Sequence, residues 1–279
     1  MRENPKTTLF LRYTRNSNIL FLAMNDLYAF KQQSSIKFTK KNPIHPFEDA
    51  TSLEFFSEKN DASLFLFSSC TKKRPQCLTF IRTFNYKILD MIELHLDPDT
   101  FRSMDQFKVA KPTVGTKPMI VFSGTAFDSP VTTKYTQLKS VFVDFFRGEE
   151  TETIDVLTLQ FIISVTVGEE GEGEQGPKVH VRFYMVKTMK SGQKVPRAEV
   201  EEMGPRMDFR IGRVKEADED MMKQAMKRSK DGEVSLLQAC HFTINWTLLM
   251  TPDRPRQRRT SRRISLVIRS VAFIWAGKT

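Results

Sequence analysis

The spacing of hydrophobic and polar positions divides the first hundred residues into short strands and two helices. Residues 7–11 form an apolar run typical of a strand. Ser17 precedes a segment, residues 19–30, whose apolar side chains recur at helical spacing, so we expect a helix with Ser17 as its N-cap. The other elements expected in this part are strands over residues 36–38, 63–67, 78–84 and 88–96 and a short helix over 49–58.

After residue 117 a similar order of strand, helix and strands begins again. The expected elements are a helix over 136–146, strands over 119–123, 157–167, 179–187, 198–203 and 207–214, and a charged helix over 217–230. Prolines and turn formers predict a loop over 39–46 and a connector over 97–117. The pattern predicts a mixed α/β (α+β) chain. Its expected parts are an N-terminal half (4–100), a connector (101–117), a C-terminal half (118–215), a helix (216–230) and a basic tail (231–279).

The charge of the chain favours a polyanionic partner. It carries 43 Lys and Arg against 33 Asp and Glu, a net charge of +10, with excesses of +4 in residues 1–50 and +7 in residues 251–279. Further basic clusters on expected loops and strand ends suit phosphate binding, because Lys supplies a point charge and Arg a bidentate contact. The candidate RNA-binding residues are Lys37, Lys40, Lys41, Lys72, Lys73, Arg74, Arg206, Arg210 and Arg213. For the arginines near Asp208, a salt bridge on the strand is the alternative.

The same sequence lacks the usual marks of an enzyme. None of the four histidines lies in an HExxH pattern, and there is no G-x-S-x-G motif for a nucleophile, so we expect no catalytic residue and no cofactor. Cys70, Cys77 and Cys240 have spacings that no disulfide framework or four-ligand zinc site uses, so we expect a reduced compartment and no metal. The longest apolar run of the tail, residues 264–277, is interrupted by Arg269, so no membrane span is expected.

Several motifs in order along the chain carry a resemblance to a known family. The run EEMGPRMDFRIGR at residues 201–213 resembles the closing signature of the Brix-domain family of ribosome-assembly factors. The further stretches that match are IKFTKKN (36–42), HPFED (45–49), LEFFSEKND (53–61), KKRP (72–75) and GTKP (115–118). The similarity covers residues 4–230, about four fifths of the chain. The apolar segment 236–250 and the arginine-dense segment 254–263 do not resemble the family.

The resemblance implies a fold, a function and partners. The implied fold is a Brix domain of two αβ halves, each similar to an anticodon-binding domain. The implied function is that of a non-enzymatic factor of the nucleus and nucleolus, active in rRNA processing and 60S subunit assembly. It would form a heterodimer with the regulator of ribosome synthesis, and the pair would load 5S rRNA and its two ribosomal proteins onto the pre-rRNA particle. Of the candidate residues, those inside matching motifs carry over as RNA or partner contacts: Lys40, Lys41, Lys72, Lys73, Arg74, Arg206, Arg210 and Arg213.

Two other functional classes remain open from the residues alone. One is an RNA-processing enzyme that uses an anticodon-binding-like module, and the other is a structural scaffold that binds no RNA. The lack of a nucleotide-binding or acid/base motif argues against the enzyme. The basic clusters argue against a scaffold without RNA.

Overall fold

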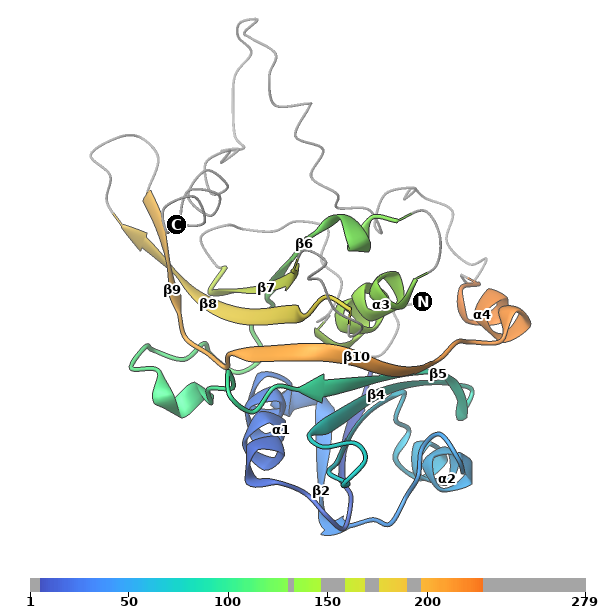
Figure 1. Cartoon of the computed structure of the whole chain (residues 1–279). Helices are drawn as coiled ribbons and strands as arrows, with labels where there is room; N and C mark the ends of the chain where they lie inside the picture. The colour runs from blue at the N-terminus through green and yellow to red at the C-terminus, as the bar shows by residue number, and fades with distance from the viewer. Residues whose placement is uncertain (1–5, 130–132, 147–158, 169–175, 190–196, 228–279) are drawn as a thin grey trace, which may run out of the picture.

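A ten-stranded sheet runs through the computed structural model, which describes residues 6–129, 133–146, 159–168, 176–189 and 197–227 (Figure 1). The strands of the first part are β1 (Thr8–Arg12), β2 (Ser35–Lys41), β3 (Leu64–Ser69), β4 (Cys77–Phe84) and β5 (Lys87–Leu96). Those of the second part are β6 (Met119–Ser123), β7 (Phe161–Val167), β8 (Val179–Met189), β9 (Arg197–Glu202) and β10 (Met207–Lys215). The α-helices are α1 (Asn18–Phe30), α2 (Thr51–Asn60), α3 (Lys134–Phe146) and α4 (Glu219–Ala225).

The two parts of the chain meet at an antiparallel strand pair. The strand order is β2-β1-β3-β4-β5-β10-β8-β7-β6, with β9 paired to β8 outside this path. β1 is parallel to β2 and β3, and β6 is parallel to β7, whereas the strands between them are antiparallel. β5 and β10 join the parts, from Leu96 opposite Phe209 to Met91 opposite Lys215. The two expected halves therefore share one continuous sheet of a mixed α/β fold.

Local sequence explains how several of these elements begin and end. The expected N-cap of α1 is confirmed, since the Ser17 hydroxyl accepts a hydrogen bond from the Leu20 N–H at 3.2 Å. α2 ends at Asp61, which adopts the left-handed conformation that terminates many helices. Asn85 and Tyr86 both have positive φ, 49° and 63°, which is the two-residue turn that suits the twist of the β4–β5 hairpin.

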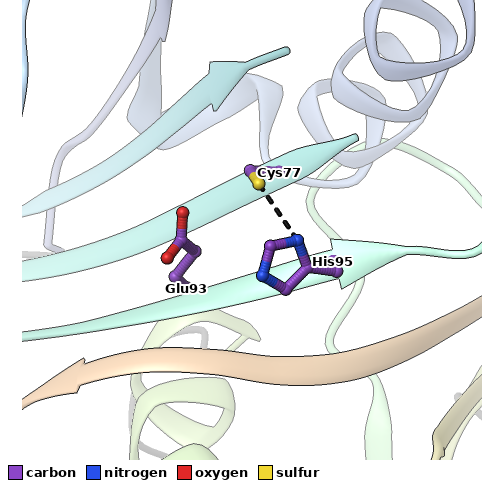
Figure 2. A group of neighbouring side chains, drawn as sticks. All are labelled: Cys77, Glu93 and His95. Atoms are coloured by element: carbon purple, nitrogen blue, oxygen red, sulfur yellow. Dashed lines mark hydrogen bonds between the residues drawn. The ribbon is translucent and has the colours of Figure 1, made fainter. Parts of the chain in front are cut away.

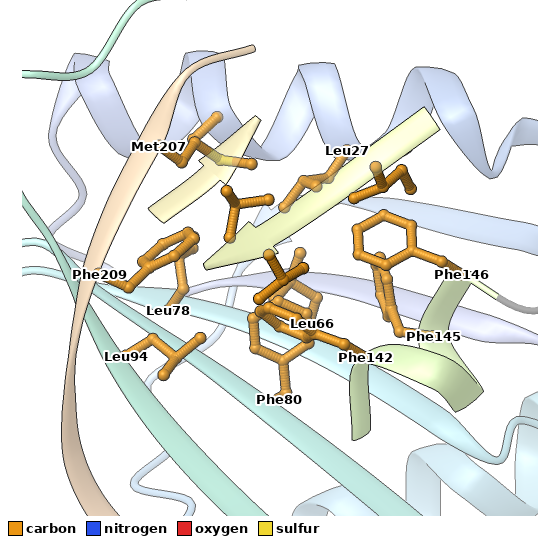
Figure 3. Close-up of a cluster of buried hydrophobic side chains, with 14 of the residues drawn as sticks. Leu27, Leu66, Leu78, Phe80, Leu94, Phe142, Phe145, Phe146, Met207 and Phe209 are labelled. Carbon is orange, nitrogen blue, oxygen red and sulfur yellow. The ribbon is translucent and has the colours of Figure 1, made fainter. Parts of the chain in front are cut away.

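One hydrophobic core is shared by both parts of the chain (Figure 3). The α3 side chain Phe145 packs on Phe10 of β1 and Phe80 of β4, with ring centroids 6.2 and 5.1 Å apart. In the opposite direction, Phe30 at the end of α1 stacks on Phe183 of β8 at 4.7 Å. Each part thus supplies a helix that covers strands of the other part. Many of the phenylalanines pack where the two parts meet.

The opposite face of the sheet differs between the two parts. In the first part a second cluster packs Leu53 of α2 against Leu9, Phe65 and Ile81, so β1, β3 and β4 are buried on both faces. In the second part β8 alternates from residue 179 to 184, with apolar side chains buried and polar ones partly exposed. Of these polar side chains, His180 and Arg182 pair with Asp208 of β10.

One expectation about a loop and one about a helix are wrong in detail. The loop expected over 39–46 begins only at Asn42, because β2 continues through Lys41, which pairs with Arg12 after a bulge. The charged helix expected over 217–230 begins at Glu219 and ends at Ala225, and none of its side chains is buried. Residues 228–230, most of the glycine-rich loop 168–176 and the tail 231–279 lie outside the described residues.

The connector expected over 97–117 is packed against the body of the protein. Met104 is buried, and its N–H donates to the Asp26 carboxylate of α1 at 3.0 Å. The Lys111 ammonium donates to the carbonyls of Met104, Phe107 and Met203. Burial raises the pKa of Asp26 to about 6, and the hydrogen bond from Met104 only partly offsets this effect. Asp26 and Lys111 therefore hold the connector in place, through hydrogen bonds to α1 and to the Met203 carbonyl.

A buried ion network ties the β4–β5 hairpin to α3. The Arg82 guanidinium pairs with Asp90 of β5 and, at 2.7 Å, with Asp144 of α3, and it donates to the Ser140 hydroxyl at 2.8 Å. Burial alone would raise the pKa of Asp144, but Lys6 and Arg82 together lower it below its usual value. Arg82 is 6% exposed, so the pair has little access to water.

We expect Arg82→Met to destabilise the protein by about 3–5 kcal/mol, because it leaves the buried Asp90 carboxylate without its cation and Asp144 with Lys6 alone. Urea unfolding measures this loss. The matched control is Lys139→Met, whose partner Asp128 has a side chain 63% exposed, and its effect is expected to stay below about 1 kcal/mol. A loss for Arg82→Met as small as that of the control would contradict the role of the network.

We expect Asp26→Asn to stabilise the protein at pH 7 by on the order of 2 kcal/mol. The pKa of Asp26 is about 6 in the folded protein against an ordinary value of 3.8, so the unfolding free energy of the unmodified chain falls as pH rises between these values. The variant lacks this loss, and the two proteins are expected to be equally stable below about pH 4. Unfolding at several pH values tests this, with Asp99→Asn as the exposed control. A stability difference that does not depend on pH would refute the prediction.

Candidate nucleic-acid interface

The carboxyl ends of three parallel strands meet at one edge of the sheet. β1, β2 and β3 run in the same direction, so the segments that follow them leave the sheet side by side. The Asn42 N–H, after β2, donates to the Arg12 carbonyl at 2.8 Å. The Cys70 N–H, after β3, donates to the Arg15 carbonyl at 3.2 Å. Backbone bonds therefore hold together three segments that are far apart in the sequence.

Six exposed cationic side chains lie on these segments, and we call them the basic edge. They are Arg15 after β1, Lys40 and Lys41 at the end of β2, and Lys72, Lys73 and Arg74 after β3. No ion pair joins any of the six to another residue within the described ranges. Unneutralised cations on one edge create a positive potential that attracts polyanions.

The turn between β3 and β4 is shaped without help from its charged side chains. The Thr71 N–H donates to the Arg74 carbonyl at 3.0 Å, and the Arg74 N–H donates to the Thr71 hydroxyl at 3.1 Å. Gln76 adopts a positive φ of 53°, and its side chain accepts a hydrogen bond from the Ser17 hydroxyl. Lys72, Lys73 and the Arg74 guanidinium are therefore free to contact a ligand.

Arg15 is a member of the basic edge that sequence reasoning missed. It lies in the short link between β1 and α1, outside any basic cluster of the sequence. Its position beside the β3–β4 turn depends on the hydrogen bond between its own carbonyl and the Cys70 N–H. Only the parallel pairing of β1 with β3 signals this proximity, and no local pattern in the sequence does.

Lys37 points toward the body of the protein, unlike Lys40 and Lys41. Its ammonium donates to the Asn25 side chain and lies 5.2 Å from the ring centroid of Phe21 and 5.6 Å from that of Tyr28. Burial lowers the pKa of Lys37, and the nearby Arg12 lowers it further. Lys37 therefore binds α1 to β2 through cation–π contacts.

Two of the candidate arginines near β10 are paired with carboxylates. Arg206 Nε donates to Glu202 Oε1 at 2.9 Å. Arg213 Nε donates to Glu93 Oε2 at 2.8 Å, and its guanidinium carbon lies 4.1 Å from the ring centroid of Phe47. Burial alone would raise the pKa of Glu93, but the bonds from Arg213 lower it. These arginines neutralise buried or half-buried acids.

Arg210 is exposed on the sheet face between these pairs, directly opposite His95 of β5. The salt bridge that the sequence left open for Asp208 is formed with Arg182 of β8 at 2.7 Å, and the His180 ring lies 2.8 Å from the same carboxylate. Burial alone would raise the pKa of Asp208, but these two partners hold it far below its usual value. Asp208 therefore stays ionised and unsuited to act as a base at neutral pH.

The titratable groups of the described residues suit binding better than catalysis. Asp90, Glu93 and Asp208 are buried carboxylates held by arginines. Burial raises the pKa of the Cys77 thiol to about 12, so this thiol is neutral and a poor nucleophile. The basic edge instead offers positive charge along a line of strand ends, which matches an extended polyanion. Among the described helices, none is long and apolar enough to cross a membrane.

Comparison with known proteins finds a family and close relatives. Residues 13–213 match the family model of the Brix domain. A ribosome production factor 2 homolog of Chaetomium thermophilum is 52% identical, covering 82% of this chain and 72% of the relative. A ribosome production factor 2 homolog of Schizosaccharomyces pombe is 46% identical, covering 83% of this chain and 72% of the relative. Ribosome biogenesis protein RPF2 of Saccharomyces cerevisiae is 48% identical, covering 83% of this chain and 68% of the relative.

We expect Arg213→Ala to lower the unfolding free energy by about 1–3 kcal/mol. The Glu93 side chain is only 3% exposed, and in this variant its carboxylate loses its cation. Arg15→Ala is the matched control, and it is expected to change stability by less than about 0.5 kcal/mol. Chemical unfolding of both variants gives the comparison. Equal stabilities would show that Arg213 is not held by the fold and is available for a ligand.

Proposed function

Because this chain belongs to the Brix domain family of ribosome biogenesis proteins, we propose that it assembles the large (60S) ribosomal subunit by binding 5S rRNA through its basic edge. The observation that carries the proposal is the basic edge itself, six exposed cations from three segments without an ion-pair partner in the described part of the chain. Neutralising RNA phosphates at this edge releases counterions, which favours binding.

The proposal includes the partners and the location that the family suggests. The chain forms a heterodimer with the regulator of ribosome synthesis, and this pair brings 5S rRNA with its two ribosomal proteins into the nucleolar precursor of the large subunit. The names of the relatives support the ribosome-assembly part of this proposal.

A binding role accounts for the described residues better than an RNA-processing enzyme does. The buried acids are neutralised by arginines, and the Cys77 thiol is kept neutral by burial. General acid–base chemistry requires a group whose pKa lies near the working pH and which can reach the substrate. Among the carboxylic acids of the described residues, Asp26 has a pKa raised to about 6, but it is buried and accepts a hydrogen bond from Met104.

We expect replacement of Lys72, Lys73 and Arg74 by Ala to weaken 5S rRNA binding by about 10- to 100-fold at moderate salt. The slope of log K against log salt concentration is expected to become shallower by roughly 2–3, since about 0.7–0.9 is lost for each phosphate contact. Fluorescence anisotropy of labelled RNA with the full chain, at four or more salt concentrations, measures both. Thermal stability is expected to stay unchanged, because the three side chains are exposed and do not hold the turn.

The matched control removes the same charge elsewhere, with Lys87, Lys108 and Lys227 replaced by Ala. All three are exposed, and Lys87 begins β5 at the end far from the basic edge. An equal loss of RNA affinity in both triple variants would show that only the net charge matters, and it would refute the basic edge as the RNA contact. Unchanged RNA binding together with loss of the co-purifying partner protein would assign the turn to the heterodimer instead.

A further inference from the structure

A cysteine, a glutamate and a histidine come together on one face of β4 and β5 (Figure 2). Cys77 is the first residue of β4 and lies directly opposite His95 of β5, and Glu93 is two residues before His95 on the same face. The Cys77 Sγ lies 3.1 Å from His95 Nδ1. One ligand atom from each of the three side chains lies within 4.8 Å of the other two.

The surroundings of the cluster are shaped to hold the imidazole. Cys77 is 0% exposed and Glu93 is 2% exposed, whereas His95 is partly accessible. Gly212 of β10 lies against the ring: a Cβ at this position would be 2.6 Å from His95 Nε2 and 3.4 Å from Glu93 Cγ. The φ angle of Gly212 is not in the left-handed region, so its glycine serves to leave space and not to allow an unusual backbone.

We propose that Cys77, Glu93 and His95 bind a divalent cation of the zinc class. Thiolate, imidazole and carboxylate are the protein ligands that Zn²⁺ takes, and the combination of a soft sulfur with nitrogen and oxygen disfavours Mg²⁺ and Ca²⁺. The Cys77 thiol is neutral without a metal, and binding of the cation releases its proton to solvent. A tetrahedral zinc ion requires its ligand atoms to be about 3.4–3.6 Å apart. The observed separations of 3.1 Å and below 4.8 Å reach this range with side-chain shifts of about 1 Å.

The groups around the cluster support a metal in this position. Arg213 holds Glu93 Oε2 at 2.8 Å and lies farther, at 3.4 Å, from Oε1, so one carboxylate oxygen is oriented while the other is less engaged. The Pro75 carbonyl oxygen lies 3.4 Å from His95 Nδ1 and 3.5 Å from the Cys77 Sγ, so a fourth oxygen lies beside these two ligand atoms. The competing arrangement is a metal-free hydrogen bond between thiol and imidazole, and the experiment separates the two.

Cobalt titration of the full chain tests the proposal, because Co²⁺ replaces Zn²⁺ and a thiolate ligand gives a charge-transfer band in the near ultraviolet. A chelator first removes any bound metal from the protein, and the metal-free protein is titrated with Co²⁺. The Co²⁺ is then exchanged for Zn²⁺, and mass spectrometry counts the bound Zn²⁺. We expect one equivalent of either metal, with the band lost in Cys77→Ser and His95→Gln and with Glu93→Gln at least 10-fold weaker in metal affinity. Circular dichroism establishes that each variant is folded.

The double variant Cys70→Ser/Cys240→Ser is the matched control, since it leaves Cys77 as the sole cysteine of the chain. The charge-transfer band and the binding of one equivalent of metal are expected to persist in this double variant. This result assigns the thiolate ligand to Cys77 even if Cys77→Ser, Glu93→Gln and His95→Gln do not fold. Absence of the band from the unmodified chain, or its loss in the double variant, would overturn the proposal and leave the hydrogen-bonded thiol. The proposal does not depend on RNA binding, so the two can fail separately.

Discussion

The antiparallel pairing of β5 with β10 is the contact on which the rest of this structure depends. It makes one sheet from two stretches of chain that lie more than a hundred residues apart at the Leu96–Phe209 pair. With the sheet continuous, α3 covers Phe10 and Phe80 of the first part, and Phe30 of α1 covers strands of the second. The phenylalanines of this shared core are buried by helices of the other part, so sheet pairing and core packing stabilise each other.

Electrostatic contacts act in two different ways in this molecule. Buried carboxylates such as Asp90 and Glu93 are paired with Arg82 and Arg213, and these ion pairs fasten strands to one another and to α3. The cations at the carboxyl ends of β1, β2 and β3 have no such partners in the described ranges and keep their charge for a ligand. Burial distinguishes the two kinds, because a charge in the interior must be paired whereas an exposed charge is solvated.

The Cys77 cluster lies next to the turn that carries Lys72, Lys73 and Arg74. The Cys77 Sγ is 3.4 Å from the Arg74 carbonyl oxygen, so the polar cluster and the backbone of the basic turn are in contact. Arg210 lies beyond His95 in the same row across the sheet. The candidate RNA contacts and the candidate metal ligands therefore share one end of the sheet, where the two parts of the chain join.

The sequence by itself determined most elements, the Ser17 cap and the family, because hydrophobic spacing, capping and the long motif at residues 201–213 are local signals. It did not determine that β2 continues through Lys41 or that Met104 is buried, since both depend on partners remote in the chain. Only the tertiary structure separated Lys37, Arg206 and Arg213, which bind the protein itself, from the basic edge, and only it added Arg15. The reason is physical: a charged residue is used by the fold or left for a ligand according to which groups the strand pairing brings beside it.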